Sequence, residues 1–129
     1  MKNKILELIK QRTLIIDGAM GTQIQCSTIE DSAWLDENNE SQEGCNELLN
    51  VTAQNVISNI HKAYILSGAD MIKTNTFGCM DWVLDEYGMG HRAYELSKAG
   101  ASLVKELCKE YSTPQKPRFV LGSIGPGTK

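Results

Sequence analysis

Apolar residues recur every three or four positions in three stretches of the chain, which is the spacing of one helical face. The first stretch, 2–12, predicts a short amphipathic helix that covers one end of the core. The second, 52–68, predicts a helix that Thr52 caps and that Gly68 ends, because glycine readily adopts a left-handed conformation there. The third, 89–107, predicts a longer helix with lysine and glutamate on its outer face, preceded by a short helix that Gly88 ends. The apolar positions are Ile5, Leu8 and Ile9; then Val56, Ile60, Ala63 and Tyr64; then Met89, Ala93, Leu96, Gly100, Leu103, Val104 and Leu107.

Three other apolar runs predict strands, at 13–17, 71–77 and 118–126. Met71 and Ile72 are apolar at successive positions, which is typical of a strand covered on both faces. Each run passes directly into polar residues or glycines. Strands that alternate with helices at this spacing predict right-handed βαβ units and a parallel sheet, so an α/β fold is expected. Ligands of such folds bind at the carboxyl ends of the strands.

The segment 26–50 is polar and long for a loop in a compact domain, which is typical of lids and binding loops. Leu48 and Leu49 are expected to anchor its end to the core. Asn46 and Glu47 stand beside them, and two interpretations are open: they line a pocket, or they cap and solvate the turn.

Glycines follow two of the predicted strands. In DGAMGT (17–22) they permit a close approach of the backbone to a ligand, and Asp17 either binds that ligand or caps the turn. GSIGPGTK (122–129) superficially resembles a phosphate-binding P-loop. However, threonine precedes the lysine and no helix follows, so nucleotide binding is not expected.

Length and composition narrow the function classes. The chain has 129 residues, the length of one domain, and a formal charge of -3, which gives no electrostatic footprint for nucleic acid or anionic lipid. No apolar run is long enough to span a bilayer, and Lys2 and Lys4 precede no signal-peptide core, so a cytoplasmic protein is expected. Cys26, Cys45, Cys79 and Cys108 are scattered and are expected to be reduced packing residues rather than metal ligands. His61 and His91 each stand alone and are expected on helix flanks or at the surface.

Five motifs follow one another along the chain: DGAMGT (17–22), GCNELLN (44–50), IHKAY (60–64), GADMIKTNTFG (68–78) and GSIGP (122–126). In this order they resemble the N-terminal homocysteine-binding domain of the cobalamin-dependent methionine synthase family. The resemblance covers nearly the whole chain. GCNELLN is more similar to that family than to the betaine- and S-methylmethionine-dependent homocysteine methyltransferases.

The resemblance implies that residues 1–129 form about the first three βα units of a TIM-type (β/α)8 barrel, with the strand exits on one rim. It implies homocysteine as substrate, with Asp17, Asn46, Asn75 and Ser123 contacting its ammonium and carboxylate. The candidate substrate-binding residues are Asp17, Gly18, Met20, Gly21, Thr22, Asn46, Asn75, Ser123 and Gly125. No catalytic residue and no metal ligand is assigned within the chain.

The same resemblance implies a zinc ion, held by cysteines of later strands, that lowers the pKa of the homocysteine thiol. It also implies methylcobalamin as methyl donor and cobalamin- and folate-binding domains as partners. Such a barrel needs roughly 250 residues, so the chain is expected to be a fragment that is inactive alone. Three strands would leave an open sheet edge and an exposed apolar face.

Lys73 departs from the family, in which an acid often precedes the TNTF sequence. Its ammonium would favour a carboxylate over an ammonium if it faces the substrate. Two other functions are open: a fragment of a betaine- or S-methylmethionine-type methyltransferase, and a non-catalytic interaction module derived from the barrel. A complete flavodoxin-like domain is disfavoured, because no helix follows the third strand.

Overall fold

The computed structural model describes the backbone of residues 2–127 and the side chains of residues 4–127. Met1 and the last two residues of the P-loop-like segment, Thr128 and Lys129, therefore lie outside the described residues. The α-helices are α1 (Lys2–Gln11), α2 (Gly21–Gln25), α3 (Leu49–Thr52), α4 (Gln54–Leu66), α5 (Asp81–Leu84) and α6 (Ala93–Tyr111). The 3-10 helices are η1 (Asp31–Trp34), η2 (Asn46–Leu48), η3 (Asp85–Tyr87) and η4 (Gly90–Arg92), and the strands are β1 (Met71–Lys73) and β2 (Phe119–Leu121).

The sheet is parallel, as the sequence predicts. Strand β1 pairs with β2 in a register that sets Met71 opposite Phe119 and Lys73 opposite Leu121. The predicted first strand, 13–17, contributes only a parallel bridge between Ile16 and Met71 on the other side of β1. A five-residue strand was therefore wrong, although the segment does run along β1: Asp17 N donates to Met71 O at 2.9 Å. All three strand exits consequently lie at one edge.

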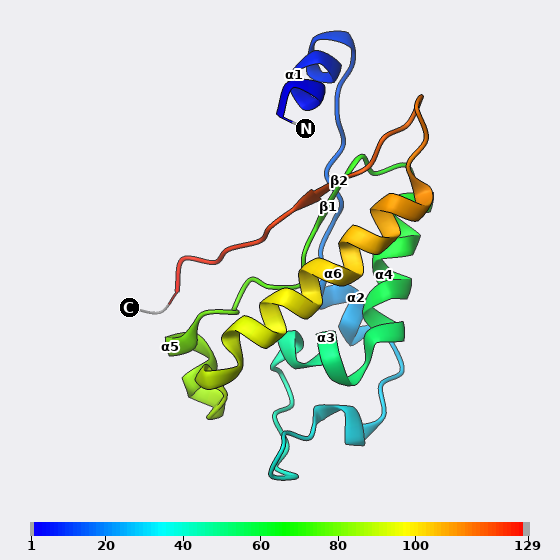
Figure 1. The fold of residues 1–129 in the computed structure, drawn as a ribbon. Coiled ribbons are helices and arrows are strands. Elements are labelled where there is room, and N and C mark those ends of the chain that lie inside the picture. Colours follow the sequence, from blue (N-terminus) through cyan, green and yellow to red (C-terminus); the bar gives the residue numbers. More distant parts are fainter. Residues whose placement is uncertain (1, 128–129) are drawn as a thin grey trace.

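Helices α4 and α6 pack side by side against the strands, and Figure 1 shows the long α6 crossing in front of α4. Apolar side chains from these elements form three buried clusters. One lies under the start of α6, one between α4, β1 and α6, and one between α2, α3 and α4. Their members are Cys45, Leu48, Leu84, Met89 and Leu96; Ile65, Ala69, Ile72, Val104 and Cys108; and Ile24, Leu49, Ile57 and Ile60.

The predicted helices are present, but the start of α4 differs from expectation. Thr52 belongs to α3, where its hydroxyl donates to Leu48 O at 3.1 Å, and Ala53 precedes α4 without a side-chain cap. The buried side of α4 also differs: Ala63 is exposed, whereas Ile57, Ile60, His61 and Ile65 are buried. The reason is that α4 contacts both α2 and α6, so its buried surface is wider than one stripe. The glycine predictions are confirmed, since Gly68 and Gly88 have φ angles of +107° and +67°.

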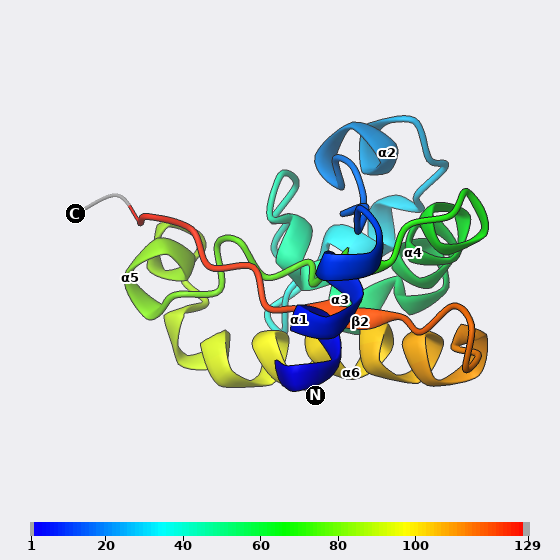
Figure 2. The ribbon, with the colours of Figure 1, turned by 90° about the horizontal axis from the view of Figure 1, so that it is seen from above.

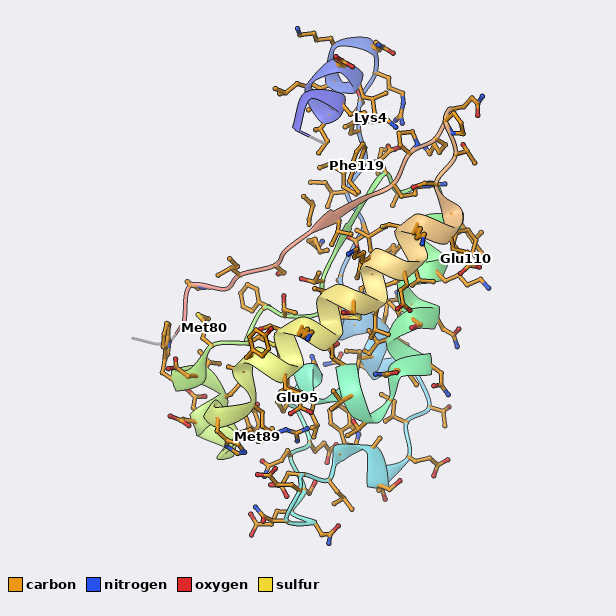
Figure 3. All side chains as sticks on the ribbon, in the orientation of Figure 1. Lys4, Met80, Met89, Glu95, Glu110 and Phe119 are labelled. Atoms are coloured by element: carbon orange, nitrogen blue, oxygen red, sulfur yellow. The ribbon has the colours of Figure 1, made fainter. Side chains whose placement is uncertain are left out.

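Helix α1 forms as predicted but does not cover the core. Leu6 and Ile9 remain more than half exposed. Figures 1 and 2 show α1 beyond one end of the strands, clear of α4 and α6 in the first view and overlying the strands in the second. Lys4 marks this separate helix in Figure 3, far from Glu95 and Glu110 at the two ends of α6. Of the predicted apolar stripe, Ile5 and Leu8 are partly buried and Ile9 is exposed, so the described residues cover it only in part.

The amino ends of the strands are held by one carboxylate. The Asp70 side chain is fully buried and pairs with Arg12 at 2.7 Å and with Lys116 at 3.2 Å. It also accepts a hydrogen bond from Ile15 N at 2.9 Å. Arg12 and Lys116 lie before the first strand run and before β2, and Ile15 belongs to the first run, so Asp70 joins all three strand segments.

His61 is a correction to the sequence analysis. It is not on a helix flank, because its side chain is completely buried on α4 and neither ring nitrogen has a hydrogen-bond partner among the described residues. Burial lowers its pKa to about 4. His91 is exposed, as predicted, and lies 2.7 Å from a Glu37 carboxylate oxygen.

The segment 26–50 is organised by its own contacts. Asp36 accepts hydrogen bonds from Asn38 N, Glu40 N and the Gln42 side chain at 2.8, 3.0 and 2.7 Å. Leu48 and Leu49 are fully buried, which confirms the predicted anchor. Within residues 2–127, no helix is long and apolar enough to cross a membrane.

Candidate functional site

A pocket of about 310 Å³ opens at the edge where the strand segments end. Its residues come from the exit of the first strand run, from η2, from the end and exit of β1, and from the exit of β2. They are Asp17, Gly18, Ala19, Met20, Gly21, Asn46, Glu47, Lys73, Thr74, Asn75, Thr76, Phe77 and Ser123.

Seven of the nine predicted site residues line this pocket, and two do not: Thr22 and Gly125. Thr22 is an exposed residue of α2. Gly125 is buried, and its N–H donates to Phe77 O at 3.0 Å, which joins the β2 exit to the β1 exit. A Cβ at Gly125 would stand 2.5 Å from that oxygen, so glycine is required there for packing. Neither residue is positioned to touch a ligand in this pocket.

Asp17 and Lys73 form an ion pair at the pocket wall. The Lys73 ammonium lies 3.3 Å from Asp17 Oδ1 and donates to Asp17 O at 2.9 Å and to Gly18 O at 3.2 Å. The Lys73 N–H also donates to Asp17 Oδ1, at 3.1 Å. Burial raises the pKa of Asp17, and the contacts with Lys73 oppose that shift without cancelling it. Lys73 thus lines the pocket, but its ammonium already contacts Asp17 and Gly18 at the first strand exit.

Asn75 is held by a pair of asparagines. Its amide donates to Asn46 O at 2.8 Å and to Asn50 Oδ1 at 3.0 Å. The amide of Asn50, which is completely buried, donates in turn to Asn75 O at 2.7 Å and to Leu96 O at 3.2 Å. Both amide hydrogens of Asn75 are therefore engaged in positioning the β1 exit.

Two threonines of the β1 exit form a closed ring of hydrogen bonds with Ser123. Thr76 donates its only hydroxyl hydrogen to Ser123 O at 2.8 Å, so Thr74 must be the donor in the 2.6 Å contact between the two hydroxyls. Ser123 N donates to the Thr74 hydroxyl at 2.9 Å. The ring fixes the β2 exit beside the β1 exit, and it uses both threonine hydrogens.

Glycine at position 18 leaves room for the aromatic side chain of Tyr64. A Cβ there would lie 2.8 Å from the Tyr64 hydroxyl oxygen and 2.9 Å from its ring. Tyr64 donates that hydroxyl hydrogen to Ala19 O at 2.8 Å. The IHKAY motif is thereby connected to the DGAMGT turn.

The described residues do not fit a zinc site. No group of three or more histidine, cysteine, aspartate or glutamate side chains is arranged to hold a metal ion within residues 4–127. Cys45 and Cys79 lie near the pocket wall, but burial raises the pKa of each thiol to about 11. Both are therefore neutral thiols at neutral pH.

Six pocket residues were outside the predicted set or left ambiguous: Ala19, Glu47, Lys73, Thr74, Thr76 and Phe77. Glu47 was left open between lining a pocket and capping a turn, and the structure places it in the pocket wall. Thr74 completes the exit of β1, which the resemblance already assigned to the rim. The buried Asn50 was missed altogether, and its only signal was an amide directly after two core leucines.

The sequence of the chain was compared with a family model and with curated proteins, and both matches extend over most of the chain. A sequence model described as homocysteine S-methyltransferase matches residues 14–129. The methionine synthases of Mycobacterium tuberculosis and Mycobacterium leprae are each 42% identical over 127 residues, which are 97% of this chain and 10% of each relative. The chain thus spans about a tenth of the length of these curated relatives.

A solved structure has the same fold. The homocysteine methyltransferase MmuM from Escherichia coli, in an oxidized form, superposes with a TM-score of 0.69 and 23% sequence identity. The match covers 92% of this chain and 39% of that one. Because the family match extends over most of the sequence, this chain belongs to the homocysteine S-methyltransferase family.

Proposed function

We propose that this chain is the part of a methionine-synthase-type homocysteine S-methyltransferase that binds the amino-acid end of L-homocysteine. The observation that carries the proposal is the pocket at the three strand exits, which contains both signs of charge and seven of the residues predicted from the family resemblance. A zwitterionic amino acid needs both an acceptor for its ammonium and donors for its carboxylate, and such groups are present there.

Two donors in the pocket remain available for the carboxylate. The side-chain amide of Asn46 and the hydroxyl of Ser123 make no hydrogen bond with other described residues, although both residues line the pocket. The remaining polar groups of the wall hold the exits in place. The role of the described residues is thus to bind and orient the substrate, and no chemical step at sulfur is assigned to them.

The proposal extends to the parent protein. Residues 1–129 correspond to about the first three βα units of a (β/α)8 barrel, of which the structure contains the parallel sheet and its helices. Other parts of the enzyme hold zinc and methylcobalamin, and they include cobalamin- and folate-binding domains. The enzyme is located in the cytoplasm. The 42% identity to two methionine synthases favours this type over the betaine- or S-methylmethionine-dependent type.

Calorimetric titration of the chain with L-homocysteine tests the proposal. The wild type should bind, and Asn46→Ala should weaken binding about tenfold or more, because a hydrogen bond to a charged carboxylate contributes about 1.5–3 kcal/mol. Asn38→Ala, an exposed asparagine of the 26–50 segment, is the matched control and should leave the affinity unchanged. Absence of binding by the wild type, or equal affinity in both variants, contradicts the proposal.

A further inference from the structure

One oxygen of the Asp17 carboxylate is held by the protein, and the other is free. Oδ1 accepts a hydrogen bond from the Lys73 N–H at 3.1 Å and lies 3.3 Å from the Lys73 ammonium. Oδ2 accepts no hydrogen bond from the part of the chain that the structure describes. Because Asp17 lines the pocket, Oδ2 is the oxygen that remains for a ligand.

Lys73 has no hydrogen left for a ligand. Its ammonium carries three hydrogens, and three oxygen atoms lie within 3.3 Å of it: Asp17 Oδ1, Asp17 O and Gly18 O. The cation is therefore not available to donate to the carboxylate of a substrate. It holds the first strand exit instead, through one side-chain oxygen and two successive backbone oxygens.

This hold replaces the regular pairing of strands, which ends at Asp17. Asp17 N still donates to Met71 O, but the Lys73 N–H donates to the Asp17 side chain, and the ammonium of Lys73 takes the Asp17 backbone oxygen. Gly18, the next residue, adds backbone freedom. The direction of the strand exit, and with it that of the Asp17 carboxylate, thus depends on Lys73.

A second side chain holds the same turn without using Asp17. The Tyr64 hydroxyl, from α4, donates to Ala19 O at 2.8 Å. The two holds differ in one respect, since only that of Lys73 includes the carboxylate. They can therefore be compared in an experiment.

We infer that Lys73 is a positioning residue for amino-acid binding: it fixes Oδ1 of Asp17 and the turn behind it, so that Oδ2 is presented to the ammonium of the ligand. Lys73 itself does not touch the ligand. The inference rests on the proposed function and adds to it a residue that prepares the site before the ligand binds. Preorganisation of this kind increases affinity because the carboxylate need not be ordered on binding.

The test compares L-homocysteine with 4-mercaptobutanoate, which lacks only the amino group, by calorimetric titration of the chain. Lys73→Met removes the charge and the hydrogens of the side chain. The preference for L-homocysteine, expressed as the ratio of the two dissociation constants, should fall about fivefold, because a misplaced carboxylate makes a weaker charge-assisted hydrogen bond. Effects on the carboxylate and thiol, which both ligands share, cancel in this ratio. An unchanged or higher ratio would overturn the inference.

Two control variants separate positioning of Asp17 from general damage to the turn. Tyr64→Phe removes the hydrogen bond to Ala19 O and should leave the ratio within about twofold of the wild type. Lys105→Met removes an exposed lysine of α6 and should bind both ligands as the wild type does. If Tyr64→Phe lowers the ratio as much as Lys73→Met, the preference depends on the turn as a whole and the inference is wrong.

A double-mutant cycle shows whether Lys73 acts through Asp17. In an Asp17→Asn background, Lys73→Met should change the ratio by less than about twofold, because the carboxylate that it positions is gone. The full effect of Lys73→Met in that background would contradict the inference. If the wild type binds both ligands equally, the inference fails while binding of homocysteine remains. If the wild type binds neither ligand, the proposed function itself fails.

Discussion

Asp70 and Asp17 are buried aspartates at opposite ends of the same sheet, and the protein treats their charges in opposite ways. At the amino ends, Asp70 has two cationic partners and a backbone donor, and the Arg12 guanidinium holds its pKa well below the usual range. At the carboxyl ends, Asp17 has one partner, Lys73, whose side chain is 41% exposed, and burial raises the pKa of Asp17.

This difference in partners distinguishes a carboxylate that stabilises the fold from one that lies in the binding pocket. A buried carboxylate with enough partners joins segments and stabilises the fold. In one with too few partners, the cost of burying the charge is not fully offset. Perturbed charges of the second kind gather where ligands bind. The amino end of this sheet is accordingly closed by ion pairs, and the carboxyl end carries the pocket.

The largest expected effect comes from Asp70→Asn. It leaves the buried position without a charge to pair with Arg12 and Lys116, and we expect a loss of about 3 kcal/mol in the free energy of unfolding at neutral pH. Urea denaturation measures it. Glu95→Gln breaks the surface pair with Arg92 and is the control, with a loss of about 0.5 kcal/mol. If Asp70→Asn lost no more stability than the control, Asp70 would not be the carboxylate that stabilises the amino ends of the strands.

His61 must be separated from the aspartates before acid stability can be interpreted. Its folded pKa, about 4, lies below the ordinary 6.5, so the unfolded chain binds the proton first. Stability is therefore lost as the pH falls from about 6.5 to 4, by about 3 kcal/mol. His61→Leu should abolish this loss of stability between pH 6.5 and about 4 and keep only the loss below about pH 4 that Asp70 causes. His91→Leu, at an exposed position, should keep the pH dependence of the wild type. A persistent slope in His61→Leu would assign it to another group.

A glycine pair probes the packing of the pocket edge. Gly125→Ala forces a Cβ to within 2.5 Å of the Phe77 carbonyl oxygen, and the required shift should cost about 2 kcal/mol. Gly122→Ala, three residues earlier, meets no atom within 4 Å and should change stability by less than about 0.5 kcal/mol. Thermal unfolding compares the two variants. Equal melting temperatures would show that the β2 exit is free to move.

Asp17→Asn should have the smallest effect on stability. Because its folded pKa is raised, ionisation of Asp17 disfavours the folded state as the pH rises through that pKa, which offsets the loss of the Lys73 pair. We expect a change within about 1 kcal/mol at neutral pH, measured in urea as for Asp70→Asn. A loss as large as that of Asp70→Asn would show that the two ends of the sheet do not differ.

Sequence periodicity predicts the helices and the parallel sheet because both depend on local patterns. Gly68 and Gly88 end their helices as expected, and Leu48 and Leu49 anchor the long polar segment. Periodicity fails where one element has two neighbours. His61 follows Ile60 on α4 and was expected on the helix flank, yet it is completely buried, because α4 packs against both α2 and α6.

The same limit applies to the site, where sequence patterns predict the positions of residues but not their contacts. Strand exits predict that Asp17, Asn75 and Ser123 meet, because parallel strands end at one edge, whereas only the family resemblance adds Asn46. The sequence does not show which of their polar groups are already used. Both amide hydrogens of Asn75 are satisfied within the fold, and the partner of Asp17 is a lysine whose direction the strand pattern left open.

The buried amide of Asn50 also has an evolutionary consequence. It bridges the β1 exit and α6, and Gly100 leaves it room, since a Cβ at position 100 would lie 2.7 Å from its nitrogen. A longer side chain at position 50, 75 or 100 would collide with its neighbours. An apolar one at position 50 or 75 would leave a buried polar group without a hydrogen-bond partner. These three positions, far apart along the chain, should therefore change together among relatives or not at all.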